Sequence, residues 1–310
     1  MDLSSHDHGL PDDGAGADGL GLAELAEEVG VADPVTIAGL ATRGGPVPGV
    51  RPVMAPVGIV SIRADEMTVR CGAGTPVSEL DDALAAVGQS VAIPPTGTVG
   101  GALAVGHSGL RRLGYGPIRD TVLQVRYVSA AGEVVTAGGP TVKNVSGFDL
   151  CRLLVGSRGT LGFLAEVILR TRPRARYEQW FTSTADPWDL VATLYRPTSV
   201  LWDGERTLVL LEGDRRDVDD QARLLGLSPA DPPGSLPTGG RWSLPPNELQ
   251  RLPPTGRFVA EIGVGIVHHE HPPPDRQVDP AVSELHRRIK QRFDPTGRLN
   301  PGVSVLDGVG

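Results

Sequence analysis

The sequence is short of cysteine, lysine and aromatic residues, and it has no long apolar run. Its two cysteines, Cys71 and Cys151, lie far apart and in no metal-ligand spacing, which argues against a disulfide framework, a zinc–thiolate site and an iron–sulfur cluster. No run of about 18 apolar residues occurs, so we expect no membrane-spanning helix. The N-terminus lacks the basic-then-apolar pattern of a secretory signal. Together these absences predict a cytoplasmic protein.

Positive charge is also scarce. The chain has 29 lysines and arginines against 37 aspartates and glutamates, a net charge of −8, and its only lysines are Lys143 and Lys290. A broad surface that neutralises phosphates is therefore not expected, which argues against nucleic-acid binding. Any anionic ligand must be held by a local group of donors.

The length and composition are those of two globular domains. The chain has 310 residues, of which 40% are hydrophobic. Residues 1–19, rich in Gly, Asp and Ser, predict a disordered tail. Residues 20–173 mix short helices and strands without regular β-α-β spacing, which favours an α+β domain over a doubly wound one. Residues 174–310 predict a second, shorter domain.

That second half predicts a small α+β layer and a long connection. Strand and helix patterns follow one another as β-α-β-β-α between residues 178 and 225, which is typical of a ferredoxin-like layer. The proline- and glycine-rich segment 229–254 is expected to be a linker. A strand over 258–267 and an amphipathic helix over 281–293 follow. The apolar residues on one face of that helix are Val282, Leu285, Ile289 and Phe293.

A glycine-dense segment between Thr98 and Gly109 is the most informative part of the sequence. Glycines let backbone N–H groups approach a flat or phosphorylated ligand closely, and two hydroxyls add further donors. No G-x-G-x-x-G follows a strand and no Gly-Lys-Ser/Thr occurs, so this is neither a Rossmann fingerprint nor a P-loop. On spacing alone, a glycine-rich turn without a ligand is an equal alternative. The residues of interest are Thr98, Gly100, Gly101, Gly106, Ser108 and Gly109.

A second segment has the same character. It reads Lys143-Asn-Val-Ser-Gly-Phe-Asp-Leu150 and then Gly156-Ser-Arg-Gly-Thr-Leu-Gly162, so glycines again permit a close backbone approach. Lys143 stands at the start of this segment, where it is either an ordinary surface lysine or a functional one. A helix is also predicted over residues 75–88, where Thr75 starts a capping signature with Pro76 and Glu79.

In these segments and their order, the chain resembles the FAD-binding PCMH-type superfamily of vanillyl-alcohol oxidase and p-cresol methylhydroxylase. Within it, the chain is most similar to the E-subunit family of bacterial glycolate oxidases. The resemblance runs from about Pro34 to Arg172 and resumes at the last helix. Two further stretches carry it: Gly116-Pro-Ile-Arg-Asp-Thr-Val122 and the ending Phe293-Asp-Pro-Thr-Gly-Arg-Leu-Asn-Pro-Gly302.

The resemblance implies an FAD bound across two α+β subdomains, with a pyrophosphate loop at residues 36–45 that lacks the family's leading arginine. Relatives that bond FAD covalently use a His in this loop or a Cys in the glycine-dense segment. Neither is present, so the resemblance implies non-covalent FAD, with His107 as a neighbour of the flavin. The implied cofactor-binding residues are Gly39, Thr42, Thr98, Gly100, Gly101, Gly106, Ser108, Gly109, Asp120, Val122, Gly156, Gly159 and Gly162.

The resemblance further implies an FAD-dependent oxidoreductase that acts on the CH–OH group of a small 2-hydroxy acid such as glycolate or lactate. The chain would be a subunit or relative of such a flavoenzyme. The alternative is a non-catalytic or electron-relaying flavin subunit that works in a hetero-oligomer with a second flavin subunit and an iron–sulfur subunit.

The catalytic residues stay open at this point. The candidates for the base are His268 and His269, and Lys143 or Arg119 would anchor a carboxylate. Adjacent residues on a strand point to opposite faces, so at most two residues of the run His268-His-Glu-His271 converge, and a polar strand end is the competing interpretation. No metal site is predicted.

Overall fold

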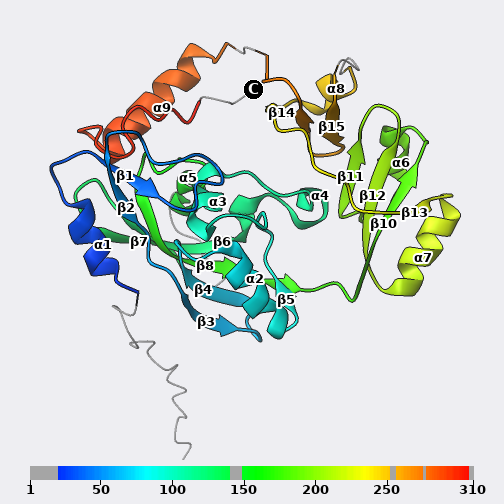
Figure 1. Ribbon diagram of the computed structural model, residues 1–310, viewed down its shortest axis with the longest axis horizontal. Coiled ribbons are helices and arrows are strands. Elements are labelled where there is room, and N and C mark those ends of the chain that lie inside the picture. Colours follow the sequence, from blue (N-terminus) through cyan, green and yellow to red (C-terminus); the bar gives the residue numbers. More distant parts are fainter. Residues whose placement is uncertain (1–19, 140–148, 252–255, 275–276, 307–310) are drawn as a thin grey trace, which may run out of the picture.

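The computed structural model describes residues 20–139, 149–251, 256–274 and 277–306. The chain forms two α+β domains, each with a sheet and an apolar core of its own (Figure 1). This α+β class confirms the prediction from the sequence. The segment 1–19, expected as a disordered tail, lies outside the described residues.

The first domain is built on a five-stranded antiparallel sheet whose central strand is β8 (Phe163–Arg170). On one side of β8 lie β4 (Thr68–Gly72) and then β3 (Ile59–Arg63). On the other side lie β6 (Val122–Val128) and then β7 (Val134–Gly138). Helices α2 (Val77–Ala86), α3 (Val99–Val105) and α5 (Leu150–Leu154) contribute to the core of this sheet. Almost every side chain of β8 is buried, as expected for a strand at the centre of a sheet.

A smaller subdomain lies beside this sheet. Strands β1 (Val35–Ala38) and β2 (Arg51–Met54) pair in parallel, and α1 (Leu22–Val29) packs with them over a core that includes Phe163 and Leu299. Two short strands, β5 (Gln89–Ser90) and β9 (Arg172–Pro173), pair at the end of the domain.

The second domain contains the expected ferredoxin-like layer. Its first four strands are β10 (Tyr177–Ser183), β11 (Ser199–Trp202), β12 (Thr207–Gly213) and β13 (Ser228–Ala230). They lie in the order β13-β10-β12-β11, all antiparallel, with α6 (Pro187–Thr193) and α7 (Arg215–Leu224) as the two connecting helices. Three more strands extend the sheet beyond β11: β15 (Phe258–Glu261), β16 (Ile266–His269) and β14 (Gly240–Ser243).

The expectation of a linker over 229–254 is wrong for part of that segment. It contains the end of β13, the whole of β14, and α8 (Pro246–Leu249). The proline and glycine content suggested a loop, but β14 pairs along its full length with β16, and this long-range pairing overrides local preference.

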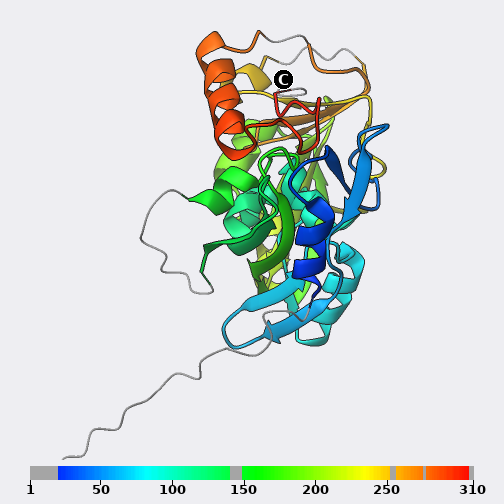
Figure 2. The same ribbon diagram turned by 90° about the vertical axis from the view of Figure 1, so that its left-hand side faces the viewer.

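Two connections hold the domains together. A short helix, α4 (Arg112–Tyr115), is followed by the 3₁₀ turn η1 (Ile118–Thr121). From α4, the N–H of Gly114 donates to the carbonyl of Thr198 at 3.1 Å, and Leu113 packs into the second core. The last helix, α9 (Pro280–Phe293), returns from the second domain to lie over the first (Figures 1 and 2). Within the described ranges, no helix is both long and apolar enough to cross a bilayer.

Candidate functional site

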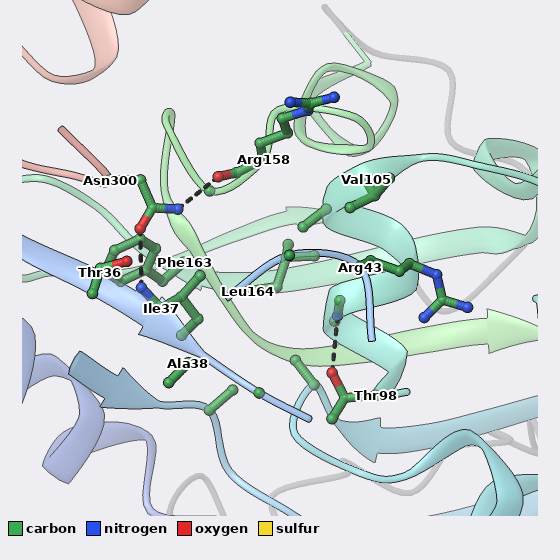
Figure 3. Close-up of a pocket in the computed structure, with 18 of the residues that line it drawn as sticks. Thr36, Ile37, Ala38, Arg43, Thr98, Val105, Arg158, Phe163, Leu164 and Asn300 are labelled. Atoms are coloured by element: carbon green, nitrogen blue, oxygen red, sulfur yellow. Dashed lines mark hydrogen bonds between the residues drawn. The ribbon is translucent and has the colours of Figure 1, made fainter. Parts of the chain in front are cut away.

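A cavity of about 560 Å³ opens in the first domain, within the usual size range of cofactor sites. Four stretches that are distant in sequence form its walls: the loop after β1, α3 with the turn after it, the turn before β8, and the C-terminal segment. They contribute mainly residues 36–45, 98–107, 157–164 and 300–303. In Figure 3, Asn300 and Thr36 lie on one side of the cavity and Arg43 on the other, while the carbonyl of Arg158 faces the Asn300 side chain.

The lining is suited to an extended, phosphate-bearing ligand. Of the 28 lining residues, eight are glycines and none is aspartate or glutamate, although the whole chain carries a net charge of −8. Arg43 and Arg158 supply positive charge, while Ile37, Val105 and Phe163 supply apolar surface. These residues therefore fit FAD, which has an apolar ring system and an anionic pyrophosphate.

Residues at the start of helix α3 determine where the helix begins and how closely it packs. The Thr98 side chain accepts a hydrogen bond from the N–H of Gly101 at 3.1 Å, so this hydroxyl caps the helix. A Cβ at Gly100 would lie 2.8 Å from the Cβ of Ala73, so glycine is required there for α3 to approach the end of β4. Gly100, which suggested a ligand site in the sequence, is therefore also needed for the packing of α3.

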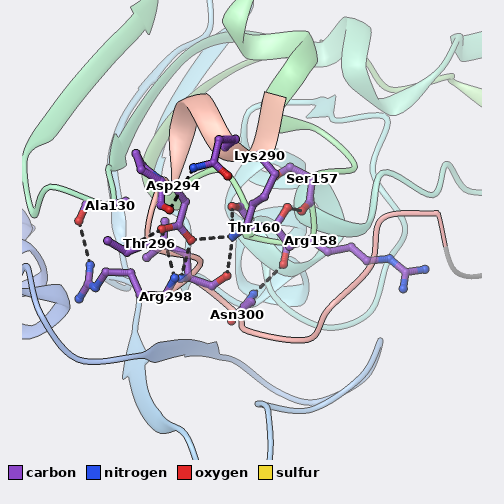
Figure 4. A network of polar contacts seen from close by, with 12 residues as sticks. Ala130, Ser157, Arg158, Thr160, Lys290, Asp294, Thr296, Arg298 and Asn300 are labelled. Atoms are coloured by element: carbon purple, nitrogen blue, oxygen red, sulfur yellow. Dashed lines mark hydrogen bonds and ion pairs between the residues drawn. The ribbon is translucent and has the colours of Figure 1, made fainter. Parts of the chain in front are cut away.

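The C-terminal segment, residues 294–303, closes one wall of the cavity. The Asn300 side chain accepts from the N–H of Ile37 at 3.0 Å and donates to the carbonyl of Arg158 at 2.6 Å, so it ties two walls together. Lys290 fastens the segment to the domain by donating to Asp294 at 2.6 Å and to the carbonyl of Thr160 at 2.7 Å (Figure 4).

Seven of the thirteen implied cofactor-binding residues line the cavity. They are Gly39, Thr42, Thr98, Gly100, Gly101, Gly159 and Gly162. The other six lie outside its wall. Gly106 caps α3, the N–H of Gly156 donates to the carbonyl of Leu103, and Val122 belongs to the core. Asp120 pairs with Arg152 at 3.1 Å, and Ser108 and Gly109 line a neighbouring cavity.

His107 marks the end of the cavity that faces the second domain. Burial is the largest cause of a lowered pKa of about 4 for His107, and the positive charges of Arg241, Arg158 and Arg43 and the nearby His268 lower it further. Because Arg241 and His268 belong to the second domain, this end of the cavity lies where the two domains meet. His107 is therefore a neutral side chain in a positively charged region.

The candidate histidines separate as strand alternation predicts. The Nε2 atom of His268 lies 2.9 Å from Oε1 of Glu261, on the face of the sheet away from the helix-covered core. His269 points into that core and stacks on Trp242 with ring centroids 4.1 Å apart. Lys143 lies outside the described residues, and Arg119 is exposed.

Two residues of this region were not predicted from the sequence. Glu261 ends an apolar strand, where a lone carboxylate was the available signal. Arg241 lies on β14, inside the segment interpreted as a linker. Among the described residues, no three His, Cys, Asp or Glu side chains converge as metal ligands do.

Comparison with known proteins gives two family matches. Residues 53–138 match the FAD binding domain family, and residues 255–303 match FAD linked oxidases, C-terminal domain. The glycolate oxidase subunit GlcE of Escherichia coli (strain K12) is 28% identical over 300 residues, which cover 79% of this chain and 84% of that protein. The D-lactate dehydrogenase of Archaeoglobus fulgidus is 40% identical over 122 residues, 38% of this chain and 27% of that protein.

Among solved structures, an alkyldihydroxyacetonephosphate synthase superposes with a TM-score of 0.66 at 15% identity, over 91% of this chain and 74% of that one. This likeness concerns the fold. The chain thus spans most of GlcE but about a quarter of the D-lactate dehydrogenase.

The fold, the cavity and these matches define a flavoprotein of the PCMH type. The chain has a PCMH-type FAD-binding domain followed by an FAD-linked oxidase C-terminal domain, which confirms the resemblance inferred from its motifs. It is an FAD-linked oxidoreductase related to the glycolate oxidase and D-lactate dehydrogenase family.

Proposed function

We propose that this protein is an FAD-dependent oxidoreductase that oxidises the CH–OH group of a small 2-hydroxy acid. The observation that carries the proposal is the acid-free, glycine-rich cavity, together with the positive charges from both domains that act on His107 at one end of it. A carboxylate substrate suits that end, because its charge is opposite to that of the surrounding arginines. The relationship to D-lactate dehydrogenase and to a glycolate oxidase subunit supports the same substrate class.

The cavity residues supply binding and orientation for the cofactor. The glycines of the loop 36–45 leave the backbone open to the pyrophosphate, and Arg43 adds positive charge beside it. Ile37, Phe163 and Val105 present apolar surface to the rings. When bound, FAD supplies the two-electron acceptor that oxidation of an alcohol requires. The thirteen residues named from the sequence remain the proposed cofactor-binding set, and the seven that line the cavity are the strongest of them.

We infer that the FAD is held without a covalent bond. None of the 28 cavity-lining residues is a cysteine, and the one histidine among them, His107, follows α3 rather than lying in the loop 36–45. Both cysteines are buried and free, which also supports the cytoplasm as the proposed compartment.

The second candidate function is a non-catalytic or electron-relaying flavin subunit. The similarity to GlcE over 84% of that protein favours this alternative, because GlcE is itself described as a subunit. The partners would then be a second flavin subunit and an iron–sulfur subunit, and the chain would need them to oxidise any substrate.

One experiment tests both functions. We expect the purified chain to show a flavin visible spectrum that bleaches under anaerobic conditions when glycolate or D-lactate is added. Acid precipitation should leave the colour in the supernatant. A yellow pellet would contradict non-covalent binding, and bleaching that requires co-purifying subunits would favour the relay function over the enzyme.

A further inference from the structure

We propose that a second cavity, where the two domains join, binds a small organic anion that carries a dianionic head group on an apolar body. The cavity has a volume of about 540 Å³, close to that of the cofactor cavity and within the range of small-molecule sites. None of its 18 lining residues lines the cofactor cavity. This inference goes beyond the proposed function, because it concerns a different cavity and does not depend on which substrate is oxidised.

The second cavity lies where the chain passes from the first domain to the second. One wall comes from α2 and from the segment 90–95, and another from the segment 108–116, which contains α4. The third wall is the connection 174–178, which leads into β10. In Figure 1, α4 and β5 lie on the side of the first domain that faces the second. A ligand in this cavity would therefore contact both domains.

Arginines predominate among the charged residues of the wall. Four arginines and two carboxylates line the cavity: Arg111, Arg112, Arg174, Arg176, Asp81 and Glu178. Both carboxylates are already paired, since Arg174 lies 2.6 Å from Asp81 and Arg111 lies 2.7 Å from Glu178. Four arginines less two carboxylates leave an excess of two positive charges, in a chain whose net charge is −8.

Arg112 and Arg176 carry that excess. Within the described ranges, neither side chain takes part in a hydrogen bond or an ion pair. Arg112 is half-buried on α4, so part of its side chain is removed from water, and Arg176 is exposed. A guanidinium matches a carboxylate or a phosphate through two parallel hydrogen bonds. An anion in the cavity would therefore supply both arginines with the partner that the protein does not provide.

The apolar part of the wall is held in place by the first core and by a fixed tyrosine. Val77 belongs to that core, and Ile93 packs against it. The Tyr115 hydroxyl donates to Glu212 at 2.5 Å, and the guanidinium of Arg172 lies 3.5 Å from the centre of the Tyr115 ring. Because these side chains are already ordered, little entropy is lost when a ligand packs on them. The wall thus suits the apolar body of a ligand.

Ser108 adds a hydrogen-bond donor. Its Oγ accepts a hydrogen bond from the N–H of Ile118 at 3.0 Å, which leaves its O–H group to donate to a ligand. Two guanidiniums and a hydroxyl match the head group of a phosphate monoester or a dicarboxylate, which carry up to two negative charges near neutral pH. Ser108 also belongs to the proposed cofactor-binding set, so the experiment has to separate an anion site from an extension of the cofactor site.

A bound anion would strengthen the joint between the domains. Arg112 belongs to the first domain and Arg176 to the connection that leads into the second, so an anion held by both bridges the two. The neighbouring Arg111 already joins α4 to the second sheet through Glu178 and Glu212. A ligand that binds only the joined arrangement stabilises that arrangement.

The test is titration calorimetry of the holoprotein with phenyl phosphate, with phthalate and with benzamide, which has a similar ring without charge. We expect at least one of the two anions to bind with a Kd below about 1 mM and to raise the Tm of the holoprotein. Tighter binding of phenyl phosphate would assign a phosphate monoester, and tighter binding of phthalate would assign a dicarboxylate. Benzamide should not bind.

Variants identify the residues that hold the anion. Arg112→Met and Arg176→Met should each weaken binding by roughly 10- to 100-fold at unchanged FAD occupancy. Arg112→Lys should recover part of the loss, because lysine keeps the charge but not the paired hydrogen bonds. Since Arg112 is half-buried, the exposed Arg176 provides the test if the Arg112 variants do not fold. The matched control is Arg170→Met, because Arg170 is exposed and lines neither cavity.

Four results would overturn the proposal. Neither anion binds the holoprotein at about 10 mM. Binding is equal in wild type and in both methionine variants, which would make the two arginines ordinary solvated side chains. Benzamide binds as well as the anions, so that only the apolar wall contributes. Saturating anion releases FAD, which would make this cavity part of the cofactor site. Failure of every 2-hydroxy acid to reduce the flavin would refute the proposed function and leave these binding results unchanged.

Discussion

At the residue scale, neighbouring side chains in this site differ sharply in what they can do. His268 and His269 are adjacent, yet one faces the domain boundary beside Glu261 and the other is stacked in the core on Trp242. Thr98 has two roles, because its hydroxyl oxygen accepts the hydrogen bond that caps α3 while its O–H group can still donate to a ligand in the cavity. A residue type suggests a chemistry, and the direction of its side chain decides whether that chemistry is available.

The loop 36–45 allows a residue-scale test of where the cofactor lies. A Cβ at Gly45 would meet no atom within 4 Å, so the fold tolerates a side chain that a bound ligand would not. We expect Gly45→Val to bind FAD roughly 10-fold or more weakly while the free energy of unfolding of the apoprotein changes by less than about 0.5 kcal/mol. Measurements of FAD occupancy and of urea unfolding check this.

The matched control for that variant is Gly234→Val. Gly234 also has open space around its Cβ position, and it lines a different cavity, in the second domain. Equal FAD occupancy in the two variants would show that the cofactor does not pass Gly45.

At the element scale, long-range contacts changed what local patterns predicted. The helix expected after Thr75 forms as α2, but Thr75 does not cap it, because its hydroxyl bonds both backbone groups of Gly58. The apolar face predicted for α9 is only half used: Ile289 and Phe293 pack on the first core, whereas Val282 and Leu285 are 41% and 55% exposed. Helix position could be predicted from the sequence, but the partners of each helix could not.

The C-terminal segment gives an element-scale prediction about pH. Burial alone would raise the pKa of Asp294, but hydrogen bonds from Lys290 and from the backbone of Leu299 and Arg298 bring it below its ordinary value. A lowered carboxyl pKa stabilises the folded state above the ordinary value near 3.8 and loses that stabilisation as the pH falls through the folded-state pKa. We expect Asp294→Asn to lower the free energy of unfolding by about 2–3 kcal/mol at pH 7.

The difference between wild type and Asp294→Asn should shrink as the pH is lowered below about 4 in urea unfolding experiments. The exposed Asp231→Asn serves as the control and should change little at any pH. A difference that stays constant down to pH 3 would mean that the charge of Asp294 does not contribute to holding the segment.

At the scale of the whole molecule, the proposed function depends on how the two domains are joined. Glu212 of the second domain, 7% exposed, accepts hydrogen bonds from Arg111 at 2.8 Å and from the Tyr115 hydroxyl at 2.5 Å, both from the first domain. This joint fixes α4 against the second sheet, and His107 lies only a few residues before α4. The joint therefore sets the distance between the cofactor cavity and the face that carries Arg241 and His268.

We expect Glu212→Gln to keep full FAD occupancy, because the cavity residues belong to the first domain and the C-terminal segment. Reduction by substrate should slow by roughly 10-fold or more, since a small displacement of catalytic groups is costly. Glu205→Gln, an exposed change on the same β-hairpin, is the control. Unchanged reduction in Glu212→Gln would show that the joint does not position the site.

The α+β architecture could be predicted from the sequence because its signals are local, and the class of cofactor followed from the resemblance that the ordered glycine-dense motifs carry. Glycine-dense stretches such as Thr98 to Gly109, and the loop 36–45, are read from consecutive residues, and their short-range geometry suits a phosphate-bearing ligand wherever they lie. The ferredoxin-like order of strands and helices was also visible, since each element has its own hydrophobic period.

The tertiary structure alone decided which residues meet. Asn300 reaches Ile37 across 263 residues of sequence, and Arg241 meets His268 only because β14, from a segment that looked like a linker, pairs with β16. Strand register then selects the face, and a shift of one residue would have turned His268 into the core and His269 out of it. Long-range pairing and register are collective properties of the packed sheet, and no local stretch of sequence contains them.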